Sequence, residues 1–245
     1  MIARPLFGLV STLAALLVLA APAGAETVRD HPSAVVELFT SQGCASCPPA
    51  DALLSSLADD TKVIALAYHV DYWDYVGWPD TFGSKDNSNL QRGYAKGRNS
   101  SRIYTPQMVI NGTKDVVGSR RNDVQTALDS ATLALPVEIT VANRMLKIAV
   151  APRPGLANAV VWLVTYRDRA EVRIDSGENA GKKMVYTQVV TKRQLLGAWE
   201  AASGAQLKLP LDEVLNDTST GVAVLVQQDN HGQPGAIIGA AAYEQ

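Results

Sequence analysis

Short apolar runs alternate with an amphipathic segment in the first half of the chain. Residues 34–40 and 62–70 are rich in β-branched and aliphatic side chains, which predicts two buried strands. Between them lies a segment with Asp51 near its start, in which apolar residues recur at helical spacing and form one face: Ala50, Leu53, Leu54 and Leu57. We therefore expect a strand, a helix and a second strand.

A third strand is predicted over 104–110, because this run ends at Asn111-Gly112, the dipeptide most typical of a tight hairpin turn. Residues 113–117 would return as its partner, and Ser119 would cap a closing helix that runs to about residue 131. Strand, helix, strand, hairpin and helix together predict a mixed sheet covered by helices, which is an α/β domain.

After residue 135 the pattern becomes almost entirely β. Eight short runs read as strands, at 137–141, 145–151, 159–166, 171–175, 183–191, 207–209, 222–228 and 236–242. One helical stretch is expected at 194–202. So many short strands predict a β-sandwich-like domain, which we expect to serve packing or partner binding. The expected organisation is a signal peptide at 1–25, the α/β domain at 26–134 and the sandwich-like domain at 135–245.

The N-terminus has the pattern of a secretory signal peptide. Arg4 precedes an apolar stretch at 6–21, and Ala23-Gly24-Ala25 matches the small-x-small cleavage pattern before Glu26. No later segment is apolar enough to cross a bilayer. We expect a secreted or periplasmic protein with no membrane span after cleavage. A formal net charge of −2, without any basic cluster, argues against a nucleic-acid partner.

Cys44 and Cys47 are the only cysteines of the chain. A staple for the fold would join distant segments, because stabilisation by a cross-link grows with the loop that it closes. A pair with two intervening residues closes almost no loop. Its spacing therefore indicates chemistry, either reversible disulfide formation or metal binding, and an oxidising compartment would let the disulfide persist.

The cysteine pair follows a strand and opens a helix, and Thr105-Pro106 stands at the start of the third strand. This order resembles the thioredoxin fold, in which a cis proline faces the two cysteines. The resemblance covers about residues 33–133. It implies that the main chain at Thr105 pairs with an extended substrate, and that Pro106 keeps metal ligands away from the sulfurs.

Several motifs also resemble a family of secreted bacterial thioredoxin-like proteins described as a domain of unknown function. They lie at 37–44, 47–51, 69–74, 104–107 and 177–181. The resemblance supports the fold and implies no particular reaction. Gly43 and Ala45-Ser46 replace the Trp and Gly-Pro of familiar thioredoxins, so the direction of electron flow does not follow from it.

A thiol at the N-terminus of a helix has a lowered pKa, because unpaired N–H groups and the helix dipole stabilise the thiolate. We expect Cys44, as the more exposed of the two, to attack a partner disulfide, and Cys47 to resolve the mixed disulfide. Pro48-Pro49 restricts the residue before it, so a distorted first turn is expected.

Glu37 and His69 are further candidates. Glu37 is a lone acid in an apolar strand, and could accept the proton of Cys47 as the buried acid of thioredoxins does. It lies one residue further upstream than in that pattern, which would turn it to the other face of the sheet, so a structural acid is the alternative. His69 ends the second strand as a candidate proton carrier or metal ligand, or as a hydrogen-bonded structural residue.

An aromatic-rich insert separates the second and third strands, and its second part, from Ser84 to about Gly97, reads as a helix. Trp73 and Trp78 could line a substrate groove beside the cysteines, or the insert could form its own small core. Either arrangement would restrict access to Cys44.

Three functions are consistent with the sequence. The first is a thiol–disulfide oxidoreductase that acts on protein thiols and disulfides through Cys44 and Cys47, with a redox donor or acceptor protein and no cofactor or resident metal. The second is a copper- or zinc-handling protein that uses the same thiols and His69, since soft thiolates favour such ions. The third is a secreted interaction module without catalysis.

Overall fold

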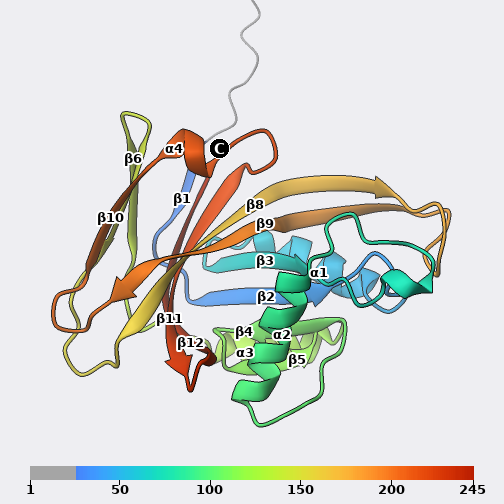
Figure 1. The fold of residues 1–245 in the computed structure, drawn as a ribbon, viewed down its shortest axis with the longest axis horizontal. Coiled ribbons are helices and arrows are strands. Elements are labelled where there is room, and N and C mark those ends of the chain that lie inside the picture. The colour runs from blue at the N-terminus through green and yellow to red at the C-terminus, as the bar shows by residue number, and fades with distance from the viewer. Residues whose placement is uncertain (1–25) are drawn as a thin grey trace, which may run out of the picture.

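The computed structural model describes residues 26–245, so the predicted signal peptide at 1–25 lies outside the described residues. Two sheets and a few helices make up this part of the chain. The large sheet has the strand order β1-β12-β11-β8-β9-β3-β2-β4-β5, and a small sheet has the order β10-β7-β6. The helices are α1 (Pro48–Ala58), α2 (Lys85–Gly97), α3 (Arg121–Asp129) and α4 (Leu211–Val214), with a 3-10 turn η1 (Asp74–Val76). The protein is a mixed α/β protein with a mostly antiparallel large sheet (Figure 1).

The strands predicted in the first half are confirmed. β2 (Ala34–Thr40) pairs in parallel with β3 (Val63–His69) and antiparallel with β4 (Gln107–Ile110), which turns back into β5 (Lys114–Val117). β2 and β3 are buried along their whole length. Their near-continuous apolar sequence is what a strand covered on both faces requires.

Helices cover both faces of this part of the sheet. α1 and α3 pack on the face that carries Ala34, Val36 and Leu38. On the opposite face, Tyr94 of α2 packs against Val35 and Phe39. Figure 1 shows α2 lying across the front of the sheet. Because side chains alternate along a strand, odd and even positions of β2 belong to different cores.

Helix boundaries follow the predicted signals in part. Ser84 caps α2 through bonds from the backbone N–H groups of Asp86 and Asn87, as expected. The predicted cap at Ser119 is wrong, since α3 begins after Arg120 and has no side-chain cap. The distortion expected before Pro48 is also absent, because Cys47 adopts right-handed helical angles and its carbonyl accepts the Ala50 N–H at 2.8 Å.

The strands of the second half continue the same large sheet. These strands are β8 (Ala159–Arg173), β9 (Lys183–Trp199), β11 (Gly221–Asn230) and β12 (Gln233–Glu244), with β1 (Thr27–Arg29) at the edge. β9 contacts β3 in parallel at Ala67 and Val189, so hydrogen bonding runs across the expected boundary at 134–135. The small sheet, made of β6 (Glu138–Ala142), β7 (Met145–Val150) and β10 (Ala205–Pro210), shares one core with β8, β11 and β12.

The helix expected at 194–202 is wrong. These residues continue β9 to Trp199, paired with β8 as far as Ala159. This stretch pairs with β8 in a long ladder, and the tertiary pairing overrides its local helical preference. β8 and β9 form one long hairpin that runs to the far end of the molecule (Figure 1). Within 26–245, no helix has the length and apolar character needed to cross a bilayer.

Candidate active site

Cys44 and Cys47 form a disulfide between the end of β2 and the start of α1. Both cysteines are fully buried, at 0 % exposure. The expectation that Cys44 is the more exposed sulfur is therefore wrong, whereas the expected restriction of access is confirmed. Only Ala45 and Ser46, between the two cysteines, are exposed at this turn.

The start of α1 offers few direct donors to a sulfur. Pro48 and Pro49 have no N–H, and the N–H groups of Ala50 and Asp51 already donate to the Cys47 carbonyl. The helix dipole still favours a thiolate at this end. The Ser46 hydroxyl lies 3.5 Å from the Cys44 sulfur and can donate to it. The side chain of Ser46 therefore supplies a contact that sequence reasoning had assigned to the backbone alone.

Thr105-Pro106 lies at the same end of the sheet, and its peptide bond is cis, as the resemblance implied. Gln107, the next residue, pairs with Phe39 near the end of β2. Trp73 links the two segments, because its indole N–H donates to the Thr105 hydroxyl at 2.7 Å and its Cβ lies against Gly43. Trp73 thus stands between the cysteine turn and the proline.

Gln42 connects the cysteine turn to the aromatic insert. Its backbone N–H donates to Asp80 at 2.7 Å, its side-chain N–H donates to the Thr81 hydroxyl, and its side-chain oxygen accepts the Trp78 indole N–H at 2.8 Å. The residue is fully buried. Trp73 and Trp78, the two residues expected to bind substrate, therefore both lie beside the cysteine turn, and Gln42 and Asp80 are additional residues that the sequence analysis did not select.

Glu37 does not reach the cysteines. It lies on the face of β2 that packs against α2, where its carboxylate accepts the Tyr94 hydroxyl at 2.5 Å. Burial raises the pKa of Glu37, against the opposing effects of Arg193, Tyr94 and Tyr68. The catalytic role predicted for Glu37 is therefore wrong, because α1 and Cys47 lie on the other side of the sheet. The alternative of a hydrogen-bonded structural acid fits the geometry.

Asp51 is the buried acid on the side of the cysteines. It lies four residues after Cys47 on α1, which places both on one face of the helix. One carboxylate oxygen accepts the Thr40 hydroxyl at 2.8 Å, and the other has no partner among the described residues. Burial raises the pKa of Asp51 to about 6, although His69 and Thr40 act to lower it. The i, i+4 spacing from Cys47 was the sequence signal that could have identified it.

His69 lies beside Asp51 at the end of β3 and is fully buried. Its Nδ1 is 2.7 Å from Asp80, and its Nε2 has no partner in the described part of the chain. Burial opposes ionisation of Asp80, but His69 and the N–H groups of Gln42 and Phe82 outweigh it and hold the pKa of Asp80 below its usual range. Asp80 and His69 thus form a buried pair that acts electrostatically on Asp51.

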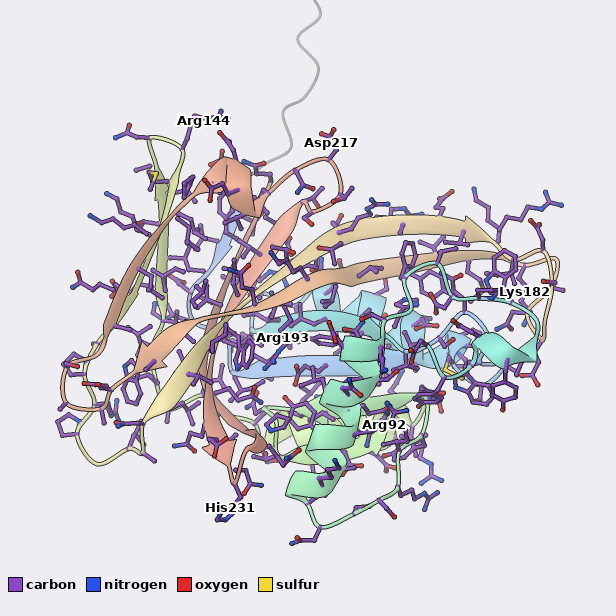
Figure 2. The ribbon with its side chains drawn as sticks, in the orientation of Figure 1. Arg92, Arg144, Lys182, Arg193, Asp217 and His231 are labelled. Atoms are coloured by element: carbon purple, nitrogen blue, oxygen red, sulfur yellow. A yellow bond between two sulfur atoms is a disulfide. The ribbon has the colours of Figure 1, made fainter. Side chains whose placement is uncertain are left out.

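The tip of the β8–β9 hairpin, residues 174–182, covers the cysteine turn. The Asn179 amide donates to the carbonyl of Gln42 at 2.9 Å and to that of Cys44 at 3.1 Å. Ser176 donates to the Gly77 carbonyl at 2.6 Å. In Figure 2, Lys182 marks this tip at the end of the molecule where the hairpin turns. Asn179, within the motif at 177–181, therefore belongs to the site, although more than 130 residues separate it from Cys44.

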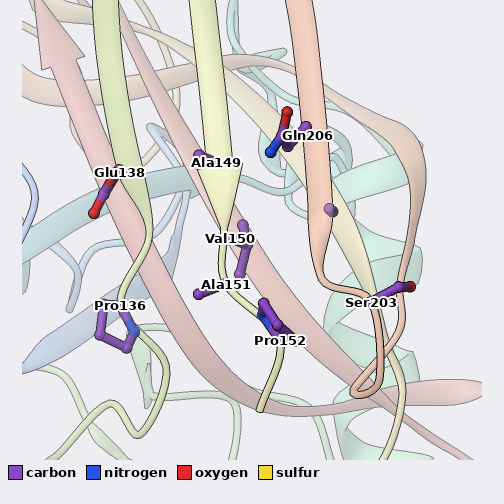
Figure 3. A pocket seen from close by; sticks show the side chains of 9 residues that line it. Pro136, Glu138, Ala149, Val150, Ala151, Pro152, Ser203 and Gln206 are labelled. Atoms are coloured by element: carbon purple, nitrogen blue, oxygen red, sulfur yellow. The ribbon is translucent and has the colours of Figure 1, made fainter.

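Another hollow lies on the small sheet, away from the cysteines. It has a volume of about 290 Å³ and is lined by residues of β6, β7 and β10 and their connections, including Pro136, Glu138, Pro152 and Gln206 (Figure 3). Most of the residues that line it have small side chains or are prolines. Among residues 26–245, no group of three or more His, Cys, Asp or Glu side chains is arranged to hold a metal ion.

Fold and site define a mixed α/β protein with a CxxC disulfide at the start of a helix. The chain belongs to the family described as protein of unknown function (DUF1223), which it matches over residues 35–227. A protein from Agrobacterium tumefaciens with a crystal structure is 36% identical, with a TM-score of 0.78, over 87% of this chain and 94% of that chain. No curated protein matches the sequence.

Proposed function

We propose that this protein is a thiol–disulfide oxidoreductase of an oxidising, extracytoplasmic compartment, built on a thioredoxin-like arrangement of β2, α1, β3, β4 and β5. The observation that carries the proposal is the disulfide between Cys44 and Cys47 at the start of α1, beside the cis Thr105-Pro106 bond. A bond that closes a loop of two residues contributes little to stability, so its value lies in being broken and remade.

In the proposed reaction, the Cys44 thiolate of the reduced protein attacks a disulfide in a partner protein. A mixed disulfide forms, and one partner sulfur leaves as a thiolate. Cys47 then loses its proton and attacks the Cys44 sulfur, which restores the internal disulfide and releases the second partner thiolate. Two electrons pass from the protein to the partner, and a dithiol donor protein would return them. The same steps run in reverse if the partner supplies the thiols.

Two neighbouring side chains act on the sulfurs in this proposal. The Ser46 hydroxyl, 3.5 Å from the Cys44 sulfur in the disulfide, donates a hydrogen bond to the thiolate that forms on reduction. Asp51 accepts the proton of Cys47, because its free carboxylate oxygen is buried one helical turn away and a pKa of about 6 makes it a carboxylate near neutral pH that can still bind a proton. His69, held by Asp80, acts on that carboxylate electrostatically and lowers its pKa.

Trapping tests the cysteine roles. The Cys47→Ser variant retains the attacking sulfur and lacks the resolving one, so covalent protein adducts should accumulate through Cys44 when the variant is produced with its leader in a bacterial periplasm. The Cys44→Ser variant is the matched control and should form few. Equal adducts in both variants, or none in either, would contradict the assignment. Insulin reduction by the purified protein tests the activity directly.

The role of Asp51 has its own test. In the Asp51→Asn variant, release of the partner from a preformed mixed disulfide should slow by about 10²-fold, the usual size of a general-base contribution. The rate of the wild-type protein should rise with pH through an inflection near 6, as Asp51 ionises, and the variant should lack this inflection. Identical pH profiles would remove Asp51 from the mechanism. Tight stoichiometric zinc or copper binding with slow insulin reduction would favour the metal-handling alternative.

A further inference from the structure

The disulfide is covered by a segment from the distant half of the chain. Both cysteines have 0 % exposure, yet the turn between them is at the surface. The cover consists of the hairpin tip at 174–182 and the insert at 73–78, which contact one another where Ser176 bonds Gly77 and Gly177 packs against Trp78. No partner sulfur can approach Cys44 in line while this cover is in place.

We propose that the hairpin tip is a gate that determines which reductants reach the disulfide, and that Asn179 is the latch that keeps it closed. This inference rests on the proposed function, since a gate matters only if the disulfide reacts. Asn179 is buried against the cysteine turn, at 1 % exposure. Its amide donates to two carbonyls of that turn, those of Gln42 and Cys44.

The tip is built to move as one piece. Its own backbone bonds, from the Ile174 N–H to the Lys182 carbonyl and from the Gly181 N–H to the Ile174 carbonyl, hold the loop together independently of the cysteine turn. Gly177 and Gly181 have positive φ angles of 77° and 80°, on either side of Asn179. Lys182 also fixes the latch side chain, because its Nζ donates to the Asn179 side-chain oxygen at 2.7 Å.

The hairpin is lightly held near this end. The apolar cluster there has three buried members, Ala170, Tyr186 and Val189, with Phe82 of the insert against it, and Ile174 is the fully buried apolar side chain of the tip itself. The other three clusters are far more extensive. Segments with little buried apolar contact open at a lower free-energy cost than the core. The tip can therefore open while the large sheet stays intact, and loss of the latch bonds shifts that equilibrium toward the open state.

Reduction of the oxidised protein by dithiothreitol tests the gate. One dithiothreitol thiolate attacks a sulfur of the Cys44–Cys47 bond, and its second thiol then closes the dithiothreitol ring, which leaves two protein thiols and transfers two electrons. Alkylation of the new thiols at timed intervals, read by mass spectrometry, gives the rate. In the wild-type protein, the rate should level off at high dithiothreitol, at the rate of opening.

Asn179→Ala should accelerate reduction by roughly tenfold or more, because two hydrogen bonds that hold the closed state are lost. Glu178→Ala is the matched control, since this neighbour in the tip lies outside the latch contacts, and its rate should equal that of the wild-type protein. Ser176→Ala removes the hydrogen bond from the tip to the Gly77 carbonyl and should give a smaller acceleration. Equal rates for the wild-type protein and Asn179→Ala would overturn the gate, as would equal acceleration by Glu178→Ala.

A hydrogen-exchange measurement separates gating from general destabilisation. In Asn179→Ala, exchange should increase at the tip and at residues 42–47 and remain unchanged in β11; faster exchange throughout the sheet would overturn the proposal. The result of the dithiothreitol experiment does not depend on the proposed function, because dithiothreitol reports access to the disulfide whether or not a protein partner exists. A wild-type protein and an Asn179→Ala variant that both fail to reduce insulin would remove the oxidoreductase assignment and leave the rate comparison interpretable.

Discussion

Asp51 gives a quantitative prediction for stability as a function of pH. Its carboxyl is fully buried, and its pKa rises from 3.8 to about 6 in the folded protein. A tenfold change in proton affinity corresponds to about 1.4 kcal/mol, so ionised Asp51 destabilises the folded state by about 3 kcal/mol. The folded protein holds this proton at a pH where the unfolded chain has lost it. Stability therefore falls as pH rises from about 4 to about 6 and then levels off with respect to this group.

The Asp51→Asn variant removes this titration and retains an oxygen that can accept the Thr40 hydroxyl bond. The difference in unfolding free energy between the variant and the wild-type protein should increase by about 3 kcal/mol, in favour of the variant, as the pH rises from 4 to 7. Urea unfolding of the oxidised protein at several pH values measures this difference, and the intact disulfide keeps the thiols out of the titration. Asp86→Asn, which changes an exposed acid in the first turn of α2, is the control.

A difference between Asp51→Asn and the wild-type protein that does not change with pH would refute the reasoning. It would mean that the carboxylate remains solvated or fully compensated in the folded state. A difference of the opposite sign would mean that the attraction of His69, which lowers the pKa of Asp51, outweighs burial. The mechanistic role of Asp51 would then lose its basis, because an acid with a depressed pKa is a poor proton acceptor near neutral pH.

Three further predictions concern packing and backbone contacts, each measured by urea unfolding at neutral pH. Trp199→Ala should lose about 3–5 kcal/mol of stability, since Trp199 is 0 % exposed in the core between the two sheets. Asn111→Ala should lose about 3 kcal/mol, because its side chain bonds three backbone groups and its φ is 47°. Gly93→Ala should destabilise despite the better helix propensity of Ala, because the new Cβ would lie 2.7 Å from Pro234, whereas Gly197→Ala has free space and should be nearly neutral. Stability gained in Gly93→Ala, or lost equally in both glycine variants, would contradict the packing argument.

Sequence patterns were sufficient for the first half because local and tertiary preferences agree there. The apolar runs of β2 and β3 are buried on both faces, and Asn111-Gly112 marks the hairpin between β4 and β5. In the second half most strands follow from the sequence, apart from the end of β9, but their partners do not. Nothing local in Val189 indicates that β9 contacts Ala67 of β3, because a long-range pairing leaves no periodic signal in either segment.

The difference between local motifs and long-range contacts also explains which site residues follow from the sequence. Cys44, Cys47 and Pro106 were recognised because each belongs to a short motif with a fixed place in a fold. The exposure of Cys44 was misjudged because its cover, Asn179, lies 135 residues away in sequence. The sequence marks Asp51 only as a helix start, because the residues that act on its carboxylate, Thr40 and His69, come from two neighbouring strands.

The Cys44–Cys47 disulfide is local in sequence, whereas the hairpin tip that covers it is distant, and this constrains the order in which the two form. Cys44 and Cys47 are three residues apart, so both sulfurs leave the ribosome together, whereas Asn179 follows 135 residues after Cys44. Because chains are synthesised from the N-terminus, and in the proposed compartment would also be exported from that end, the cysteines can meet an oxidant before the hairpin has formed. Oxidation of the newborn chain thus needs no access through the finished protein, and a molecule that is first oxidised after maturation must take a slower route.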